Sequence, residues 1–439
     1  MLPTCYSIQN MYEEYASGHS NPYCMKHFKR LVHDRFPEVK ASERTTFTEC
    51  KECSMIRNAK AGDLSKEQRL LLEEQKRAHL LVQRIAREKY YKHIKKAREN
   101  PQKYCSIIID NMDQAKTNLP RLPSYHKGDV SLTRVHHHVT GILAHGQGKS
   151  YVFTWTDKFS CDSNITMNCL LRVFDDIAQQ RRLPPTLFLQ ADNSAKDNRN
   201  FIIMGFLGSL VLRKMFKKVK LSFLMVGHTH EDVDQMFSWI SIHIGKMAIK
   251  TSDTLHEEIQ AAYHPQPTTE HLSDLWDYRA LALQSPIQLS GHKSPHCFRF
   301  HLQEDRVIMS YKEWPLQRAT FQQLDITDLA RAFDAAPHPI STMPDKGRGA
   351  FDAMGVDLPK WKRCGSLTDE EASWWEGHLE KQRTFGQPTV PKLDEFGPFL
   401  TSASEAANTM PPEIADTIRR HVSSLTQEST IRTVRQRRR

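Results

Sequence analysis

The chain has 439 residues, 39% of them hydrophobic, so it can bury a sizeable core and is long enough for two or three domains. Its longest apolar run, residues 201–212, is shorter than the roughly 18 to 20 residues that a membrane span needs, so we expect a soluble protein with no membrane partner. Its nine cysteines are scattered and odd in number, so we expect a reducing compartment. A net charge of +10, from 61 basic against 51 acidic residues, suits a polyanionic partner, although solvated helix faces would give the same balance.

Helical patterns open the chain. Residues 1–60 combine a short helical signal, "MKHFKRLVHDRF", with a turn-rich stretch that ends in "ECKEC", which fits a small N-terminal helical module able to bind zinc. Residues 61–102 are almost unbroken helix formers, with apolar residues at Leu70, Leu81 and Ile85. They predict one long, strongly charged helix that Pro101 ends.

Residues 103–250 carry alternating strand and helix patterns. Strands are expected at 104–110, 135–146, 150–157, 186–193 and 219–227, and helices at 165–183, at 200–216 and after residue 228. The resulting order, β β β α β α β α, predicts an α/β fold with a mixed five-stranded sheet and helices on both faces.

The signals weaken after residue 250. Residues 298–314 fit a hairpin and residues 367–382 fit a helix with Thr368 at its N-cap, so we expect 251–385 to be an α+β region whose role the sequence leaves open. Residues 386–439 are rich in Pro, Ser and Thr and end in "RTVRQRRR", which is typical of a disordered tail with a basic end.

Two of the predicted strands end in an aspartate, Asp110 after the first and Asp192 after the fourth. If these strands are adjacent and parallel, their carboxyl ends meet at one edge of the sheet, where an acid on the helix after the fifth strand would complete a set of oxygen ligands. Such ligands suit Mg²⁺ or Mn²⁺, which can activate a water or a 3′-hydroxyl and stabilise the leaving oxygen of a phosphodiester. Each aspartate alone could equally be a strand-end residue that enters an Asx turn.

The third acid is expected within "GHTHEDVDQMF". On a helical wheel the apolar residues from Val233 to Ile244 form one stripe, and Asp234 borders this stripe, so we predict Asp234 as the third acid. Glu231 points away from the stripe and is the reserve. Asp232 lies three residues after Thr229, where it can cap the helix.

These blocks are similar to those of a known superfamily. Strands in this order, with "IIIDNMD" after the first, "LQADNS" after the fourth and "EDVDQMF" after the fifth, resemble the RNase H-like catalytic core of DDE/D transposases and retroviral-type integrases. More narrowly, "IIIDNMDQAKTNLP", "LFLQADNSAKDNRN" and "FLMVGHTHEDVDQMFS" resemble a group of uncharacterised, transposon-derived eukaryotic proteins in which a CxxC and a long charged helix precede the core. The resemblance covers roughly residues 45–250.

The resemblance implies a metal-dependent enzyme that cleaves or joins DNA strands, with Asp110, Asp192 and Asp234 as metal ligands, no organic cofactor and action as a homo-oligomer. Two features of this sequence differ from the superfamily. The third acid is an aspartate rather than a glutamate, and "GHTHED" just before it is rich in histidine. The alternatives are a domesticated, non-catalytic DNA-binding protein that keeps the fold, and a metal-dependent nuclease of the same fold that acts on RNA or structured nucleic acid.

The histidines of "GHTH" admit other interpretations. Calcineurin-like metallophosphoesterases carry this block, but their upstream blocks are missing from this sequence, and the aspartate that zinc deubiquitinases place ten residues after the second histidine is Ile240. We therefore expect His228 and His230 to orient a metal-bound water or contact a phosphate, with Asn193 as a further ligand-binding residue. They could also be polar residues of a strand-to-helix turn. Of the "HHH" at 136–138, one or two rings are expected on the surface.

Cys50 and Cys53 have the spacing of a structural zinc site, which needs two further ligands. Cys24 and His27 would supply them in the order in which retroviral integrases place their zinc-binding pairs. The resemblance to the narrower group instead implies His79 on the long helix. The weaker candidates are His33 and His93.

Contacts with DNA phosphates are expected from the long basic helix, Lys196 and Asn200, and such contacts set affinity rather than sequence choice. The closing "RTVRQRRR" is a candidate nuclear import signal, so we expect a nuclear protein. The same segment could instead be a non-specific DNA tether or an inert tail.

Overall fold

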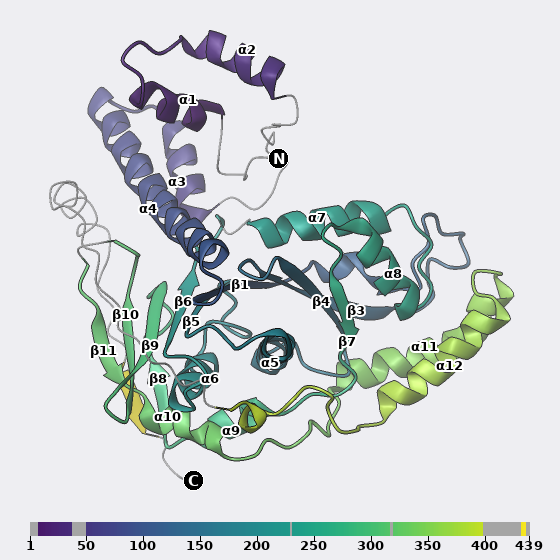
Figure 1. Ribbon diagram of the computed structural model, residues 1–439. Helices are drawn as coiled ribbons and strands as arrows, with labels where there is room; N and C mark the ends of the chain where they lie inside the picture. The colour runs from purple at the N-terminus through teal and green to yellow at the C-terminus, as the bar shows by residue number, and fades with distance from the viewer. Residues whose placement is uncertain (1–7, 37–49, 229–230, 317–318, 398–431, 436–439) are drawn as a thin grey trace. The chain divides into compact units, whose positions relative to one another are not determined.

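The computed structural model describes residues 8–36, 50–228, 231–316, 319–397 and 432–435 (Figure 1). The chain divides into two units, residues 1–83 with 225–235 and residues 84–224 with 236–439, and each is described by itself. Two helices have residues in both units, α4 (Lys66–Glu99) and α7 (Asp232–Ile244).

The first unit is helical. Besides the N-terminal half of α4 it contains α1 (Ile8–Ser17), α2 (Met25–Arg35) and α3 (Lys51–Lys60). Ser65 and Gln68 begin α4 with a capping box, because the Ser65 amide donates to Gln68 Oε1 at 2.9 Å and the Gln68 amide donates to Ser65 Oγ at 3.2 Å. The helical N-terminal module and the long charged helix expected from the sequence are therefore both present.

The second unit is an α/β structure around a mixed sheet of ten strands. The strand order is β11-β10-β9-β6-β5-β1-β3-β4-β7, and β2 pairs with β3. The strands of this sheet are β1 (Tyr104–Asn111), β2 (Asn118–Leu119), β3 (Val135–Ala144), β4 (Lys149–Thr156), β5 (Thr186–Ala191), β6 (Lys218–Phe223), β7 (Thr268–His271), β9 (Cys297–Gln303), β10 (Arg306–Lys312) and β11 (Gln322–Asp325).

The helices of the second unit, besides its parts of α4 and α7, are α5 (Ser163–Gln180), α6 (Phe201–Leu212), α8 (Ser252–Ala262), α9 (Tyr278–Leu283), α10 (Thr327–Arg331), α11 (Asp345–Arg363) and α12 (Asp369–Arg383). Three 3₁₀ helices are η1 (Gln114–Lys116), η2 (Ala332–Asp334) and η3 (Leu393–Glu395). No helix among the described residues is both long enough and apolar enough to cross a membrane.

The five central strands follow the order β4-β3-β1-β5-β6. β1 pairs antiparallel with β3 and parallel with β5, while β3 pairs antiparallel with β4 and β5 pairs parallel with β6. α5 connects β4 to β5, α6 connects β5 to β6, and α7 follows β6. This is the order of elements expected from the sequence, with β2 and η1 added between the first two strands.

Alternate residues of the central strands point to opposite faces of the sheet. On one face Ile107, Leu187 and Val219 belong to the main hydrophobic core, together with buried residues of α5 and α6. Figure 1 shows α5 and α6 lying along this side of the sheet. On the other face, the ring of His93 in α4 stacks on Phe188 of β5 with centroids 3.9 Å apart. Helices therefore cover both faces.

The same second face receives α7. Gly141 of β3 leaves a space that Met236 and Phe237 of α7 fill, so that a Cβ at this position would lie 2.6 Å from both side chains. Gly141 is paired with Asp110 in the β1–β3 register. The part of α7 that belongs to the second unit therefore packs beside the end of β1.

The region after residue 250 extends this sheet at both edges. β7 pairs parallel with β4, and β9 pairs antiparallel with β6 and is followed by β10 and β11. With these four strands and β2, the sheet has ten strands where five were expected, and residue 250 lies inside the second unit rather than at a boundary. The added strands are four to seven residues long, and their pairing with β4 and β6 is decided by tertiary contacts that local patterns do not encode.

Two local expectations for this region agree with the structure. β9 and β10 form the expected hairpin. Thr368 caps α12 with a capping box, because the Glu371 amide donates to Thr368 Oγ1 at 3.2 Å and the Thr368 amide donates to Glu371 Oε2 at 2.8 Å.

The expectation of a disordered tail from residue 386 is wrong for residues 386–397. Val390 and Leu393 are buried in the main core, and Trp276 Nε1 donates to the Val390 carbonyl at 2.6 Å. Further along, β12 (Arg432–Arg435) pairs antiparallel with β8 (Ile287–Ser290). The remainder of the expected tail, residues 398–431 and 436–439, lies outside the described residues.

Candidate functional site

Four side chains with metal-binding atoms meet in the first unit: Cys50, Cys53, His79 and His228. Cys50 is the N-cap of α3 and Cys53 lies in its first turn, because the spacing of "CKEC" corresponds to about one helical turn. His79 projects from α4, and His228 lies between β6 and α7. Each residue offers one ligand atom, and these four atoms lie within 4.8 Å of one another. We call these residues the Cys/His cluster.

The distances in the Cys/His cluster match the edges of a tetrahedron around a metal. Cys50 Sγ lies 3.4 Å from His79 Nε2, Cys53 Sγ lies 3.4 Å from His228 Nε2, and the two Nε2 atoms are 3.2 Å apart. Tetrahedral bonds of about 2.3 Å to sulfur and 2.0 Å to nitrogen would separate sulfur from nitrogen by about 3.5 Å and the two nitrogens by about 3.3 Å. The cluster could therefore hold a divalent metal with little rearrangement.

Glu52 sets the orientation of one ligand ring. His79 Nδ1 lies 2.7 Å from Glu52 Oε2, so His79 donates its Nδ1 proton to the carboxylate and keeps the Nε2 lone pair for a metal. His79 is only 4% exposed and Cys50 7% exposed. A carboxylate hydrogen-bonded to a ligand histidine is usual in metal sites and makes the ring a stronger donor.

Gly227 allows the chain to bring His228 close to α3. Its φ is +78°, a left-handed conformation that glycine adopts without steric cost. A Cβ at this position would lie 2.6 Å from the Cα of Cys50. The His228 amide donates to the Met225 carbonyl at 2.9 Å and closes the turn. The close approach of the two segments therefore depends on glycine.

The structure changes the expected ligand set. His79 belongs to the Cys/His cluster, but Cys24 and His27 do not. Cys24 is exposed at the start of α2, and His27 Nδ1 is 3.0 Å from the Arg30 guanidinium. His228, expected to orient a metal-bound water or contact a phosphate, is the fourth member of the Cys/His cluster, and the expected role stays a prediction. The sequence signal for its membership was "VGHTH", since the glycine marks a tight turn directly after a buried strand.

The remaining histidine candidates lie elsewhere. His33 is exposed next to Asp34, and His93 lies in the second unit against Phe188. His230, the other histidine expected to bind a ligand, lies outside the described residues.

Asp110 and Asp192 follow the same register on neighbouring parallel strands of the second unit. Ile109 of β1 is paired with Ala191 of β5, so the two aspartates take the next position on strands that lie about 4.8 Å apart. Both carboxylates therefore belong to the same edge of the sheet, as expected if these strands are adjacent and parallel.

The surroundings of Asp192 are polar and largely closed to solvent. Burial raises the pKa of Asp192, and hydrogen bonds from Asn198 and the Ser194 amide act in the opposite direction. Asp197 lies close to Asp192. Burial raises the pKa of Asp197, and the negative charge of Asp192 raises it further. Asp197 is itself buried and accepts a hydrogen bond from Ser194 Oγ at 2.9 Å. No sequence pattern singled out this acid, whose signal is its position five residues after Asp192.

Asn193 and Asn200 hold the segment that follows β5. Asn193 Nδ2 donates to the Leu224 carbonyl, and its Oδ1 accepts from Arg199 Nη1 at 2.7 Å. Asn200 is the N-cap of α6, and its Oδ1 accepts from the Ile203 amide at 3.0 Å. Both side-chain amides are therefore used within the fold, and the expected ligand-binding role of Asn193 and phosphate-binding role of Asn200 stay predictions. Lys196 is exposed.

The two predicted third acids belong to the segment 225–235 of the first unit. Asp234 lies in the first turn of α7, and its Oδ2 accepts from the Glu231 amide at 2.9 Å. This bond closes the N-terminus of the helix, a role that the sequence suggested for Asp232. Glu231 is buried. The assignment of Asp234 or Glu231 as the third acid stays a prediction.

His136, His138 and Asp157 form a second group of potential metal ligands, in the second unit. His136 Nδ1 and His138 Nε2 lie 3.1 and 2.9 Å from the two oxygens of Asp157, and Lys346 Nζ lies 3.2 Å from one of them. Burial raises the pKa of Asp157, but His138 and Lys346 outweigh this effect and lower it to about 2. Because Lys346 already supplies a cation, we interpret this group as a structural ion-pair cluster.

Of the three consecutive histidines, one is partly exposed, in agreement with the expectation of one or two surface rings. His137 is 0% exposed and His138 is 3% exposed, while His136 keeps 36% of its side chain exposed. His137 lies beside two other histidines, with its ring centroid 5.7 Å from that of His378 and 6.3 Å from that of His271.

Residues 127–317 match the model of a domain of unknown function, DUF7869. The matched segment contains Asp192 and His228 but neither Asp110 nor the two cysteines of the Cys/His cluster. No curated protein matches the chain.

Proposed function

We propose that this protein is a transposase-like, metal-dependent enzyme that cleaves or joins the phosphodiester backbone of DNA. The observation that carries the proposal is the register of β1 and β5, which gives Asp110 and Asp192 neighbouring positions at one edge of the sheet. Paired carboxylates of this kind hold Mg²⁺ or Mn²⁺ in enzymes that act on phosphodiesters.

The strand order supports an RNase H-like core, and its derivation from a transposase rests on the resemblance of the sequence blocks. In β4-β3-β1-β5-β6 the first three strands form an antiparallel meander, and β5 and β6 run parallel to β1. This arrangement is the one expected of the superfamily that the sequence blocks resemble. β2, β7 and the strands from β9 to β11 are then additions around the core.

The donor atoms at this edge fit a hard divalent cation. Burial raises the pKa of Asp192, and the contacts that oppose this effect come from the neutral groups of Asn198 and Ser194. A bound cation would therefore stabilise the ionised carboxylate. A divalent ion held there would polarise a phosphodiester and lower the pKa of a nucleophilic water or hydroxyl.

The third acid of the proposed site is assigned from the sequence alone, with Asp234 first and Glu231 in reserve. Replacing each in turn by its amide distinguishes them, because loss of metal-dependent activity in one variant and its retention in the other identifies the ligand.

We also propose that the Cys/His cluster holds a structural zinc ion. Two thiolates and two imidazoles make a closed set of four ligands, the set typical of structural rather than catalytic zinc. The ion would join α3, the N-terminal half of α4 and the segment 225–235, all within the first unit.

A non-catalytic DNA-binding protein is the second candidate. The Asp234 carboxylate caps α7, and the Asp192 carboxylate accepts from Asn198. Both acids therefore have structural roles that would preserve them after loss of catalysis. A nuclease that acts on RNA or structured nucleic acid is the third alternative, distinguished by its substrate preference.

The test is Mn²⁺-dependent nicking of supercoiled DNA by the purified protein and by Asp110→Asn and Asp192→Asn, with DNA binding measured in parallel. Asp305→Asn, in the exposed turn between β9 and β10, is the matched control because it removes one carboxylate elsewhere in the same unit. We expect nicking by the wild type and the control, none by the two site variants, and equal binding by all four. Binding without nicking by any of them would favour the second candidate.

The proposal includes a nuclear location and assembly as a homo-oligomer. The nuclear location rests on the basic C-terminal run, part of which, Arg432 and Arg435, belongs to β12. The oligomer rests on the resemblance to transposases, which usually act as multimers. Sedimentation of the purified protein with and without DNA tests the second point.

A further inference from the structure

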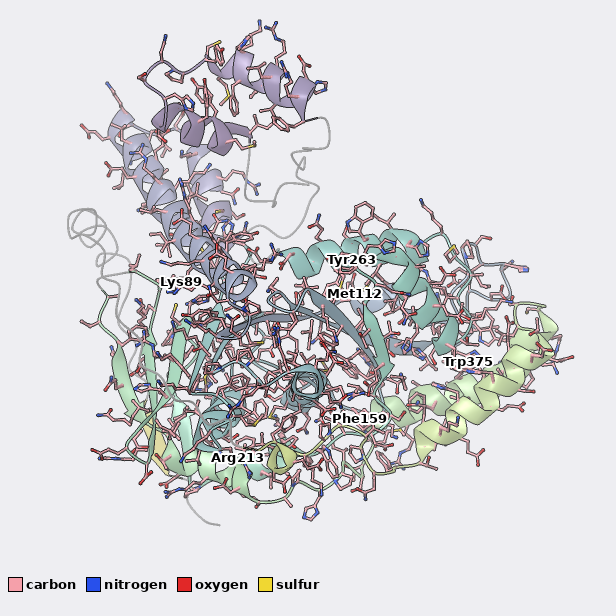
Figure 2. All side chains as sticks on the ribbon, viewed as in Figure 1. Lys89, Met112, Phe159, Arg213, Tyr263 and Trp375 are labelled. Atoms are coloured by element: carbon pink, nitrogen blue, oxygen red, sulfur yellow. The ribbon has the colours of Figure 1, made fainter. Side chains whose placement is uncertain are left out.

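Seven cations gather on the sheet face of the second unit that α4 covers. Three project from the C-terminal half of α4 and four from β6, β9 and β10. These residues, which we call the cation face, are Lys89, Lys92, Lys96, Lys218, Lys220, Arg299 and Lys312. Lys89 is labelled on α4 in Figure 2.

Strand register and helix packing bring the cation face together. Lys220 of β6 is paired with Phe188 of β5 on one side and with Arg299 of β9 on the other. On β6, Lys218 and Lys220 alternate with the buried residues Val219 and Leu221, so both lysines point away from α6. α4 lies over the same face, because its His93 stacks on Phe188.

The charges of the cation face act on one another. Burial lowers the pKa of Lys89 most. The charges of Lys92, Lys96 and Arg299 lower it further, and Cys297 acts in the opposite direction. Burial and then Lys89, Arg299 and Lys218 lower the pKa of Lys220 to about 7. Within the described part of the chain, none of the seven forms an ion pair with a carboxylate, and Arg299 Nε is buried without a hydrogen-bond partner.

Aromatic rings support the long side chains of the cation face. Lys96 lies over Tyr104 at 5.5 Å, and Lys220 lies over Phe188 at 5.2 Å. Arg299 and Lys312 share Phe321, at 4.4 and 4.8 Å from its ring centre. These contacts position the charges and keep them close to one another despite their repulsion.

We propose that the cation face binds the phosphate backbone of a nucleic acid. Crowded like charges disfavour the folded state, and a polyanion that neutralises several at once removes this cost. Lys89, Lys92 and Lys96 are spaced as i, i+3 and i+7 on one side of α4 and span about 10 Å, comparable to three steps of about 3.4 Å along one strand of a duplex. On β6, β9 and β10 no large hydrophobic side chain is exposed among the described residues, which disfavours a membrane surface.

The cation face is separate from the carboxylate pair. Lys218 begins β6 beside Thr186 of β5, whereas Asp192 follows the opposite end of β5. The two ends of this six-residue strand are roughly 17 to 20 Å apart. The choice of a nucleic acid as ligand rests on the proposed function, but binding and cleavage can be lost independently.

The test compares two double variants of the cation face, Lys89→Gln with Lys220→Gln and Lys92→Gln with Lys96→Gln, in the full-length protein. The matched control is Lys127→Gln with Lys381→Gln, which removes the same charge from exposed positions of the same unit. Anisotropy of a fluorescein-labelled random-sequence DNA duplex is measured across a range of NaCl concentrations without added divalent metal. Vesicles of phosphatidylcholine and phosphatidylserine, and a duplex RNA, are tested in parallel.

We expect each cation-face variant to lower the slope of log affinity against log salt concentration by about 2, while the control keeps the wild-type slope. The thermal midpoints of the cation-face variants should equal or exceed that of the wild type, because neutralisation relieves repulsion. Wild-type slopes in both cation-face variants would overturn the proposal, as would binding to vesicles with no binding to either nucleic acid. Normal DNA binding without nicking would reject the catalytic proposal and leave this one intact.

Discussion

The Nε2 atoms of His79 and His228 lie 3.2 Å apart although the two residues are separated by 149 positions in the chain. Both rings point this nitrogen toward the thiols of Cys50 and Cys53, and Glu52 accepts the Nδ1 proton of His79. A metal at this point would hold three separate segments of the first unit together. Its removal would therefore affect the folding of this unit as well as its metal content.

Replacing His228 or Cys53 should release zinc. We expect His228→Ala and Cys53→Ser to lose the bound metal on dialysis and to lower the thermal midpoint, because metal binding contributes directly to folding in small sites of this kind. Metal content by mass spectrometry and unfolding by circular dichroism are the measurements. Cys24→Ser is the matched control, since this thiol is exposed and outside the Cys/His cluster. Unchanged zinc content in both cluster variants would refute the assignment.

Glu52→Gln should weaken the zinc site without abolishing it. The glutamine still contacts His79 but no longer carries the charge that makes the ring a strong donor, so we expect an affinity loss of about tenfold or more. Competition with a chromophoric chelator measures the change. Glu73→Gln, which removes a carboxylate that pairs with Lys60 on the same unit, provides the control and should leave the affinity unaltered.

Gly227→Ala should disrupt the turn that carries His228. The left-handed backbone costs about 1 to 2 kcal/mol for a residue with a Cβ, and contact with the Cys50 backbone adds to this cost. We expect lower stability and weaker zinc binding together. Gly349→Ala, in α11 where a Cβ meets no atom within 4 Å, should be tolerated. Full stability and full zinc binding in Gly227→Ala would show that the turn relaxes without cost.

Four histidines of the second unit, His137, His256, His271 and His378, should make the protein sensitive to mild acid. Burial, with smaller contributions from neighbouring charges, lowers the pKa of His271 and of His378 to about 3, and burial also lowers the pKa of His137 and His256. Between pH 6.5 and about 3, the unfolded chain therefore binds protons that the folded protein does not. The free energy of unfolding should fall as the pH is lowered through this window, by up to about 1.4 kcal/mol per pH unit for each histidine, and should be independent of these groups above it.

His378→Phe tests this dependence, because phenylalanine keeps an aromatic ring beside Trp374 and Trp375 but cannot be protonated. Trp375 is labelled on α12 in Figure 2. Chemical denaturation followed by tryptophan fluorescence at pH 7.5 and pH 5.0 should give a smaller loss of stability in the variant. His126→Gln, at an exposed position, should behave as the wild type. An identical loss in all three proteins would locate the acid sensitivity elsewhere.

Local patterns in the sequence were sufficient for much of the fold. The run of buried residues in Tyr104–Asn111, the capping box at Thr368 and the near-continuous apolar run of Phe201–Leu212 each determine an element from neighbouring residues alone. The order of strands and helices up to α7 followed from these elements. It also followed that Asp110 and Asp192 would share an edge if their strands were adjacent and parallel, because strand ends in a parallel pair coincide.

The tertiary structure determined which residues far apart in the sequence become neighbours. The short strands β7 and β9 extend the central sheet by pairing with β4 and β6, and no local pattern specifies such a partner. The fourth member of the Cys/His cluster was missed for the same reason. "GHTH" shows two histidines after a strand, but only folding brings Gly227 against Cys50 and turns His228 toward Cys53. Periodicity determines which face a residue occupies within its own element, whereas packing of distant segments determines which other residues share that face.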